Sequence, residues 1–451
     1  MATLFVFGVF MFLILRAWSQ KKSRFPELAQ RYLCLMPFVP LISLINHNID
    51  HERFGMSFRL APFFLMSVLL AYSFGMHRSI SASYRGGKEF LFLACYAVLS
   101  LFSAFFATDI TWALISWGWT VPGCLVFLVA GQMSRIDDLA RNREMVYTVL
   151  AFLSINLALV AYGLLTGRAS DVFHTRNFGS AFASNSVLLF LTVYSGFGWV
   201  HARKSFVWMF LFIGFSAFSM LISISRTSVG VALIYASFMV TLRFHEFRRL
   251  AVSIAVATCF LWIALIAFEK VSGLQFTDQL VVNWQNRLGS GSLQRTFEAA
   301  MSHRAHIFDE EWRHVADQGP FVGEGFGNFQ ATTSGGFRDG HNLLLTESYE
   351  NGWMATGFLY AFLIAGIGHA IRKLSSGSRD EWPIPFCLLG FMFIAHTTGA
   401  VMSSRGFDSY YTPVSGWGIC FLIGLLSSNR KAAIHQLSSH RIPSPRIVKA
   451  A

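Results

Sequence analysis

Hydrophobic segments of about 20 residues recur along the whole chain and are separated by shorter polar stretches. Each segment is long enough to cross roughly 30 Å of hydrocarbon as an α-helix. The pattern predicts spans near residues 2–17, 32–47, 59–76, 89–107, 111–132, 145–166, 180–200, 206–224, 227–242, 250–268, 342–370, 383–403 and 411–427. We therefore expect an all-α polytopic membrane protein with about 12–13 transmembrane helices.

One long polar segment interrupts this pattern and divides the chain. We expect amino-terminal membrane helices over residues 1–268, a loop over 269–341, further membrane helices over 342–428 and a basic, disordered tail over 429–451. Within the loop, a helix is predicted at about 293–316 because apolar residues recur there at helical spacing. These residues are Phe297, Met301, Phe308, Trp312 and Val315. The Gly-rich stretch 323–329 that follows is expected to be flexible.

Composition agrees with a membrane protein, and the distribution of charge predicts its orientation. The chain has 451 residues, is 54% hydrophobic and is only 13% charged, about half the charged fraction of soluble domains. Its net charge of +12 could indicate nucleic acid, but about two thirds of the 36 lysines and arginines fall in alternate loops. Positive loops stay in the cytoplasm, so the long loop is predicted to be periplasmic and nucleic acid is not a predicted partner.

Several polar or sulfur-containing groups invite a cofactor or metal interpretation that we do not favour. The six cysteines all fall in predicted helices without CxxC spacing, which predicts buried, unpaired thiols. The loop from His47 to Glu52 resembles a metal site, but a solvated polar loop is the simpler interpretation. The Gly-rich stretch 323–329 lacks the preceding strand and following helix of a dinucleotide fingerprint. We therefore predict no metal and no cofactor.

Three residues on the predicted outward side could carry chemistry. Arg226 lies at a boundary between two spans, and His341 stands where the long loop meets the next hydrophobic run. Arg304 falls at the centre of the apolar stripe of the loop helix, whereas Arg313 falls on its opposite face. Guanidinium groups bind phosphate oxygens, and imidazole can accept a proton from a hydroxyl near neutral pH. Alternatively, Arg226 is an interfacial anchor and Arg304 pairs with a carboxylate of the loop.

Four sequence segments, taken in order, resemble the bacterial O-antigen ligase and O-antigen polymerase superfamily. They are RNFGSAFASN (176–185), SISRTSVG (223–230), SHRAHIFDEEWRHVADQGPFVGEGFGNF (302–329) and HNLLLTESYENG (341–352). The resemblance covers about residues 176–357, while the amino-terminal third is similar only as a series of helices. One departure is Ala355, which stands where glycine or threonine is usual.

The resemblance implies a GT-C-like membrane fold and a glycosyl transfer at the periplasmic face of the bacterial inner membrane. The implied donor is a glycan linked to undecaprenyl diphosphate, and the acceptor is lipid A–core or a growing glycan. Arg226 and Arg304 would bind the diphosphate, and His341 would orient or deprotonate the acceptor hydroxyl. The supporting residues would be Asn342, Glu350, Arg176 and Asn185.

The same motifs serve two activities, and a third function belongs to another class. A ligase transfers a finished polymer to lipid A–core, whereas a polymerase joins lipid-linked repeat units into O-antigen or exopolysaccharide. We favour the ligase. A transporter or flippase of lipid-linked glycan would instead require charged residues in the middle of the membrane helices. Few are found there, so transport is the least favoured alternative.

Overall fold

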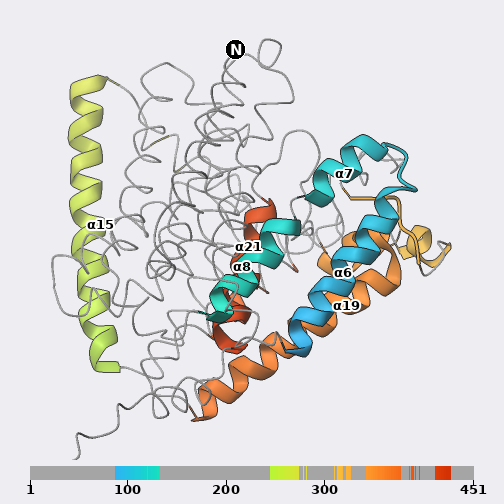
Figure 1. The fold of residues 1–451 in the computed structure, drawn as a ribbon. Coiled ribbons are helices and arrows are strands. Elements are labelled where there is room, and N and C mark those ends of the chain that lie inside the picture. The colour runs from blue at the N-terminus through green and yellow to red at the C-terminus, as the bar shows by residue number, and fades with distance from the viewer. Residues whose placement is uncertain are drawn as a thin grey trace, which may run out of the picture.

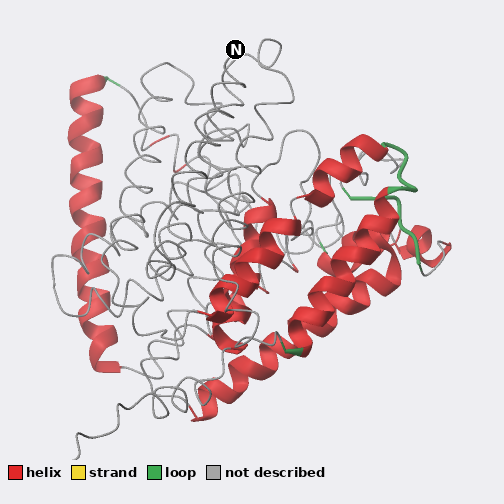
Figure 2. Cartoon of the chain, viewed as in Figure 1, coloured by secondary structure: helices red, strands yellow, loops and turns green. Residues whose placement is uncertain are grey.

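A computed structural model of the chain describes six helices and the short segments near them. The described residues are 87–118, 120–132, 244–273, 278, 281, 309, 312–317, 321–326, 342–376, 385, 388–390, 392, 396 and 412–427. They form helices and connecting loops, and this part of the chain contains no strand (Figure 2). The predicted all-α character is therefore confirmed for the described residues.

The helices follow five of the predicted hydrophobic segments. They are α6 (Lys88–Ala104), α7 (Ile110–Gly118), α8 (Thr120–Gln132), α15 (Phe244–Ser272), α19 (Leu343–Ser376) and α21 (Thr412–Ser427). The span predicted over 111–132 corresponds to α7 and α8, which lie on either side of the undescribed Trp119. Pro122 falls in the first turn of α8, where a missing backbone N–H costs little. The spans predicted amino-terminal to residue 87 and between 133 and 243 lie outside the described residues.

Two helix pairs organise this part of the molecule. The first pair is α6 and α19, which run side by side, and the second is α8 and α21 (Figure 1). The backbones of α8 and α21 approach closely at Gly424, because a Cβ there would lie 2.5 Å from the carbonyl oxygen of Phe127. Gly366 of α19 likewise leaves room for Ile423, whose Cδ1 would be 2.6 Å from an added Cβ. Small residues at these positions permit the tight packing typical of membrane helices.

Aromatic side chains fill the space where the two pairs meet. The ring of Phe127 on α8 contacts Phe362 of α19 edge-on, with ring centroids 5.6 Å apart. The same ring stacks with Phe90 of α6 at 6.2 Å. Trp417 of α21 is fully buried. These contacts join three helices from distant parts of the sequence and fix the position of α19.

The outer surfaces of the helices are apolar. On α15, the exposed side chains of Val252, Val256, Phe260 and Ile263 recur at helical spacing and follow one face. Exposed apolar surface of this extent is typical of a protein that contacts a membrane or a partner. Among the described residues, α19 is long and apolar enough to cross a bilayer by its length and composition.

One cysteine prediction is wrong. Cys420 is buried and Cys95 and Cys124 are half-buried, but Cys259 is exposed. Its helix α15 turns apolar side chains outward, so a small hydrophobic residue there need not be buried. The four described cysteines are unpaired thiols, as expected, and Cys34 and Cys387 lie outside the described residues.

Candidate functional site

The start of α19 is fixed by Asn342, one of the predicted supporting residues. Its side-chain oxygen accepts hydrogen bonds from the backbone N–H groups of Leu344 at 2.9 Å and Leu345 at 3.4 Å. Asn342 is therefore the N-cap of the helix. α19 begins at Leu343, at the start of the predicted hydrophobic run. His341 directly precedes the cap and lies outside the described residues.

A kink at Gly352 interrupts α19. This glycine has φ 79° and ψ 165°, a left-handed conformation that a residue with a side chain rarely adopts. The kink leaves backbone carbonyls of the preceding turn able to accept hydrogen bonds from outside the helix. The Glu324 N–H donates to the carbonyl of Tyr349 at 2.9 Å, and the Gly325 N–H donates to that of Glu350 at 2.8 Å.

These donors belong to the described segment 321–326, which includes the first four residues of the Gly-rich stretch 323–329 and which we call the Gly-rich segment. A Cβ at Gly323 would lie 2.4 Å from the backbone of Glu350, so only glycine fits at this approach. Gly325 has φ 85°, a backbone conformation that also favours glycine. We expected the Gly-rich stretch to be flexible, but its described part is held against α19 by main-chain hydrogen bonds. The expectation failed because the acceptors are created by a kink far away in the sequence.

Ser103 of α6 completes this junction between the Gly-rich segment and α19. Its hydroxyl accepts a hydrogen bond from the Gly323 N–H at 2.9 Å and donates one to the Glu350 carbonyl at 2.9 Å. Ser103 is fully buried. We refer to Ser103, the segment 321–326 and the kinked turn 349–352 as the glycine junction. Sequence reasoning missed Ser103, because a serine within an apolar helix has no distinguishing pattern.

The turns of α19 before the kink bury an unusual number of polar side chains. The buried residues are Thr346, Glu347, Ser348, Glu350 and Asn351. One oxygen of Glu347, Oε2, accepts hydrogen bonds from the hydroxyl of Tyr96 at 2.7 Å and from the side-chain amide of Asn351 at 2.9 Å. Two donors on one carboxylate oxygen offset part of the cost of burying it. These carboxylates lie in the first turns of α19, whereas the expectation of few charged residues concerned the middle of the membrane helices.

Glu350, the second predicted supporting residue, lies in the same turn as the kink. Its side chain is 3% exposed, and its main-chain carbonyl is the acceptor shared by Ser103 and Gly325. Two carboxylates, Glu347 and Glu350, thus occupy the buried face of one helix segment. Glu350 was singled out from the sequence, but Glu347 was not, because the span was recognised by its average hydropathy.

The described part of the predicted loop helix packs beside the kink. Residues 312–317 are helical, and Val315 is fully buried, as its place in the apolar stripe predicts. Trp312 was expected in the same stripe but is 47% exposed. The indole N–H of Trp353 donates to the carbonyl of Val315 at 3.3 Å, and the ring of Trp312 meets Trp353 edge-on at 5.8 Å. Arg313 is exposed and pairs with Asp309 at 4.0 Å, which confirms its predicted place on the solvent face.

His314 connects the loop helix to both sides of the glycine junction. Its ring stacks on Tyr349 of α19 with centroids 4.6 Å apart. Its Nε2 lies 3.4 Å from Oε1 of Glu324 in the Gly-rich segment. The loop helix, the Gly-rich segment and the start of α19 therefore form one packed unit in the described structure.

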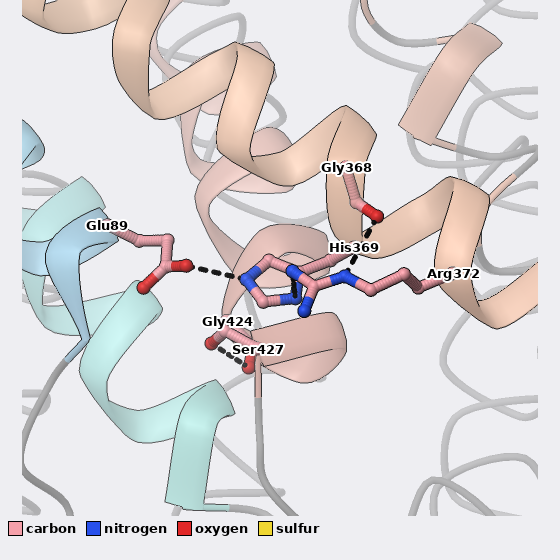
Figure 3. A network of polar contacts seen from close by, with 6 residues as sticks. All are labelled: Glu89, Gly368, His369, Arg372, Gly424 and Ser427. Atoms are coloured by element: carbon pink, nitrogen blue, oxygen red, sulfur yellow. Dashed lines mark hydrogen bonds and ion pairs between the residues drawn. The ribbon is translucent and has the colours of Figure 1, made fainter.

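A second polar cluster occupies the other end of the α6–α19 pair (Figure 3). Nε2 of His369 lies 2.6 Å from Oε1 of Glu89, and Nδ1 lies 3.1 Å from Nη2 of Arg372. Arginine offers only donors, so Nδ1 accepts and the ring proton on Nε2 faces Glu89. The spacing of His369 and Arg372 on one helix predicts their contact, but the partner on α6 could not be read from it.

The structure describes two of the predicted site residues, and their roles in the site stay predictions. Asn342 caps α19, and Glu350 lies within it. The other predicted residues lie outside the described part of the chain: Arg176, Asn185, Arg226, Arg304 and His341. Ala355, the departure from the family pattern, is buried within α19. Comparisons with protein families, curated proteins and solved structures found no match for this chain.

Proposed function

We propose that the protein is a polytopic inner-membrane glycosyltransferase of the O-antigen ligase type. It would transfer a glycan from undecaprenyl diphosphate to a sugar hydroxyl of lipid A–core at the periplasmic face. The observation that carries the proposal is the glycine junction, which joins two of the four segments that resemble the family. Those segments contain Arg304 and His341, the residues with the chemistry that such a transfer needs.

The physical setting of the described helices supports a reaction at a membrane. The exposed faces of α15 and α6 are apolar, and α19 has the length and composition of a span. A polyprenyl diphosphate donor would keep its lipid tail in the bilayer and present its headgroup at the surface. The packed unit formed by the loop helix and the start of α19 would lie at that surface under the predicted topology.

The proposed chemistry assigns one task to each predicted residue. The acceptor hydroxyl attacks the anomeric carbon and transfers its proton to His341. The bond between the anomeric carbon and the diphosphate oxygen breaks, and its electron pair leaves with the diphosphate. Arg226 and Arg304 stabilise the charge that develops on this leaving group, because guanidinium groups remain protonated and fit phosphate oxygens. Attack opposite the leaving group inverts the configuration at the anomeric carbon.

The decisive experiment measures transfer by the purified protein from lipid-linked donor to lipid A–core, without nucleotide. We expect His341→Ala, Arg304→Ala and Arg226→Ala each to reduce turnover by roughly 100-fold or more, the size expected for loss of a general base or of charge stabilisation. Arg313→Ala is the matched control, because Arg313 lies on the exposed face of the same loop helix. Full activity of both His341→Ala and Arg304→Ala would refute the assignment.

A polymerase of the same superfamily is the nearest alternative. The donor chemistry is shared, so the acceptor distinguishes the two activities. A strain lacking a ligase retains lipid-linked polymer but loses all surface O-chains. A strain lacking a polymerase attaches single repeat units or loses its exopolysaccharide. The glycan pattern of a deletion strain complemented with His341→Ala therefore separates them.

Transport of a lipid-linked glycan is a second candidate, and one observation favours it. Glu347 and Glu350 are ionisable residues buried within a candidate membrane span, a position common in proton relays and substrate paths. A transporter would move labelled donor across proteoliposomes without forming a new glycosidic bond. Product analysis in the same vesicles distinguishes the two functions, because only the transferase releases undecaprenyl diphosphate.

A further inference from the structure

We propose that Ser103 of α6 is a positioning residue for the transfer reaction, an inference that rests on the proposed function. Ser103 lies in the amino-terminal third of the chain, to which the family resemblance assigns no role. Its hydroxyl bridges two segments, accepting from the Gly323 N–H and donating to the Glu350 carbonyl, each at 2.9 Å. Both contacts are buried, so water does not replace them in the folded protein.

Each of the two segments joined by Ser103 is continuous in sequence with one proposed part of the site, either the diphosphate-binding Arg304 or the base His341. Gly323 follows the loop helix and belongs to the same segment of resemblance as Arg304. Glu350 lies on the helix that begins directly after His341 and Asn342. A displacement of one segment relative to the other would separate the diphosphate from the base. Misplacement by about 1 Å can reduce a rate on the order of 100-fold.

The hydroxyl of Ser103 suits this bridge because it donates and accepts at the same atom. The main-chain hydrogen bonds from Glu324 and Gly325 attach the Gly-rich segment to α19, and neither of these bonds involves α6. The side chain of Ser103 adds hydrogen bonds from α6 to both of these segments, so it fixes their junction against a third element. Its loss should leave the segments folded but less closely positioned.

The same helix offers a matched control. Ser100 is also fully buried, one turn away from Ser103. Its hydroxyl donates to the carbonyl of Tyr96 at 2.7 Å, a bond within α6 itself. Ser100→Ala therefore removes a buried hydroxyl of the same helix without breaking the bridge. Ser103→Thr and Ser103→Val form a second control, because the two replacements have the same shape and differ in the hydroxyl.

The test measures kcat and the KM for lipid-linked donor in the full-length protein. We expect Ser103→Ala and Ser103→Val to lower kcat by about tenfold with KM within about twofold, because only transition-state positioning is lost. Ser103→Thr should retain most of the activity, and Ser100→Ala should resemble the wild type. Equal losses in the Thr and Val variants would overturn the proposal, because the added methyl group would then be the cause.

Hydrogen exchange provides a readout that does not depend on transfer. The backbone amides of segment 321–326 should exchange faster in Ser103→Val than in Ser103→Thr, because the Gly323 N–H loses its acceptor. Equal exchange in both variants would refute the bridge. If the wild type transfers no glycan, the proposed function fails and so does the positioning role of Ser103. If the wild type is active but Ser103→Val retains full kcat, only the inference about Ser103 fails.

Discussion

The two ends of the α6–α19 pair are held together by different chemistry. At the amino-terminal end of α19, two glycines, Gly323 and Gly352, allow close approach of backbone to backbone, and the polar groups involved are almost completely buried. At the other end, the side chains of Glu89, His369 and Arg372 form the contact (Figure 3). His369 and Glu89 remain 16% and 14% exposed. A main-chain junction tolerates almost no change of residue, whereas a side-chain cluster near solvent can rearrange.

The largest effect is expected from Gly323→Ala at the buried end. The added Cβ would meet the backbone of Glu350 at 2.4 Å, so the Gly-rich segment must move away. Its three hydrogen bonds to α19 and Ser103 would be lost, at about 1 kcal/mol each, or about 3 kcal/mol of unfolding free energy. Glycan transfer should fall by roughly 100-fold. Unfolding in detergent micelles and a transfer assay measure the two quantities.

Gly357→Ala is the control for this substitution. Gly357 is a helical residue of α19, and an added Cβ there would meet no atom within 4 Å. Alanine favours helix over glycine by about 0.5–1 kcal/mol, so this variant should be at least as stable as the wild type. If Gly323→Ala behaves like Gly357→Ala, the junction does not depend on close backbone approach.

An intermediate effect is expected from Glu347→Leu at the same end. The hydroxyl of Tyr96 and the amide of Asn351 would both lose their acceptor in a buried environment. Buried groups without partners cost about 1–3 kcal/mol each, and removal of the buried carboxylate offsets part of this cost, so we expect a net loss of about 2 kcal/mol in unfolding free energy. Glu347→Gln keeps an acceptor oxygen and should lose about half as much. Equal stability of the Leu variant and the wild type would show that this hydrogen-bond pair contributes little.

The smallest effect is expected from His369→Ala at the side-chain end. Glu89 and Arg372 can then reach solvent, so the unfolding free energy should fall by only about 1 kcal/mol. Glycan transfer should stay within about twofold of the wild type, because this cluster lies at the opposite end of α19 from the junction. A loss of stability as large as that of Gly323→Ala would remove the contrast between the two ends.

Local sequence patterns predicted the helices better than their contacts. The start of α19 could be predicted because a polar cap, Asn342, directly precedes an apolar run. Val315 and Arg313 took the faces assigned by helical periodicity, whereas Trp312 of the predicted apolar stripe is 47% exposed. The role of the glycines could not be predicted in the same way. Gly323 needs its small size because of Glu350 and donates to Ser103, which precedes it by 220 residues.

The buried carboxylates show a second limit of sequence reasoning. A span is recognised by its average hydropathy, and α19 passes that test although Glu347 and Glu350 are buried within it. What makes Glu347 tolerable is Tyr96, a residue of another helix. The convergence of Arg226, Arg304 and His341 remains a prediction, since these residues lie outside the described structure.

The bridge made by Ser103 also constrains the order of assembly. Ribosomes produce Ser103 long before its partners, which follow 220 and 247 residues later. Until the chain has been synthesised through Glu350, this hydroxyl has neither of its bridging partners. The junction is thus completed late in biogenesis. In a nascent chain that stops before the kink at Gly352, α6 lacks most of α19, the helix against which it packs.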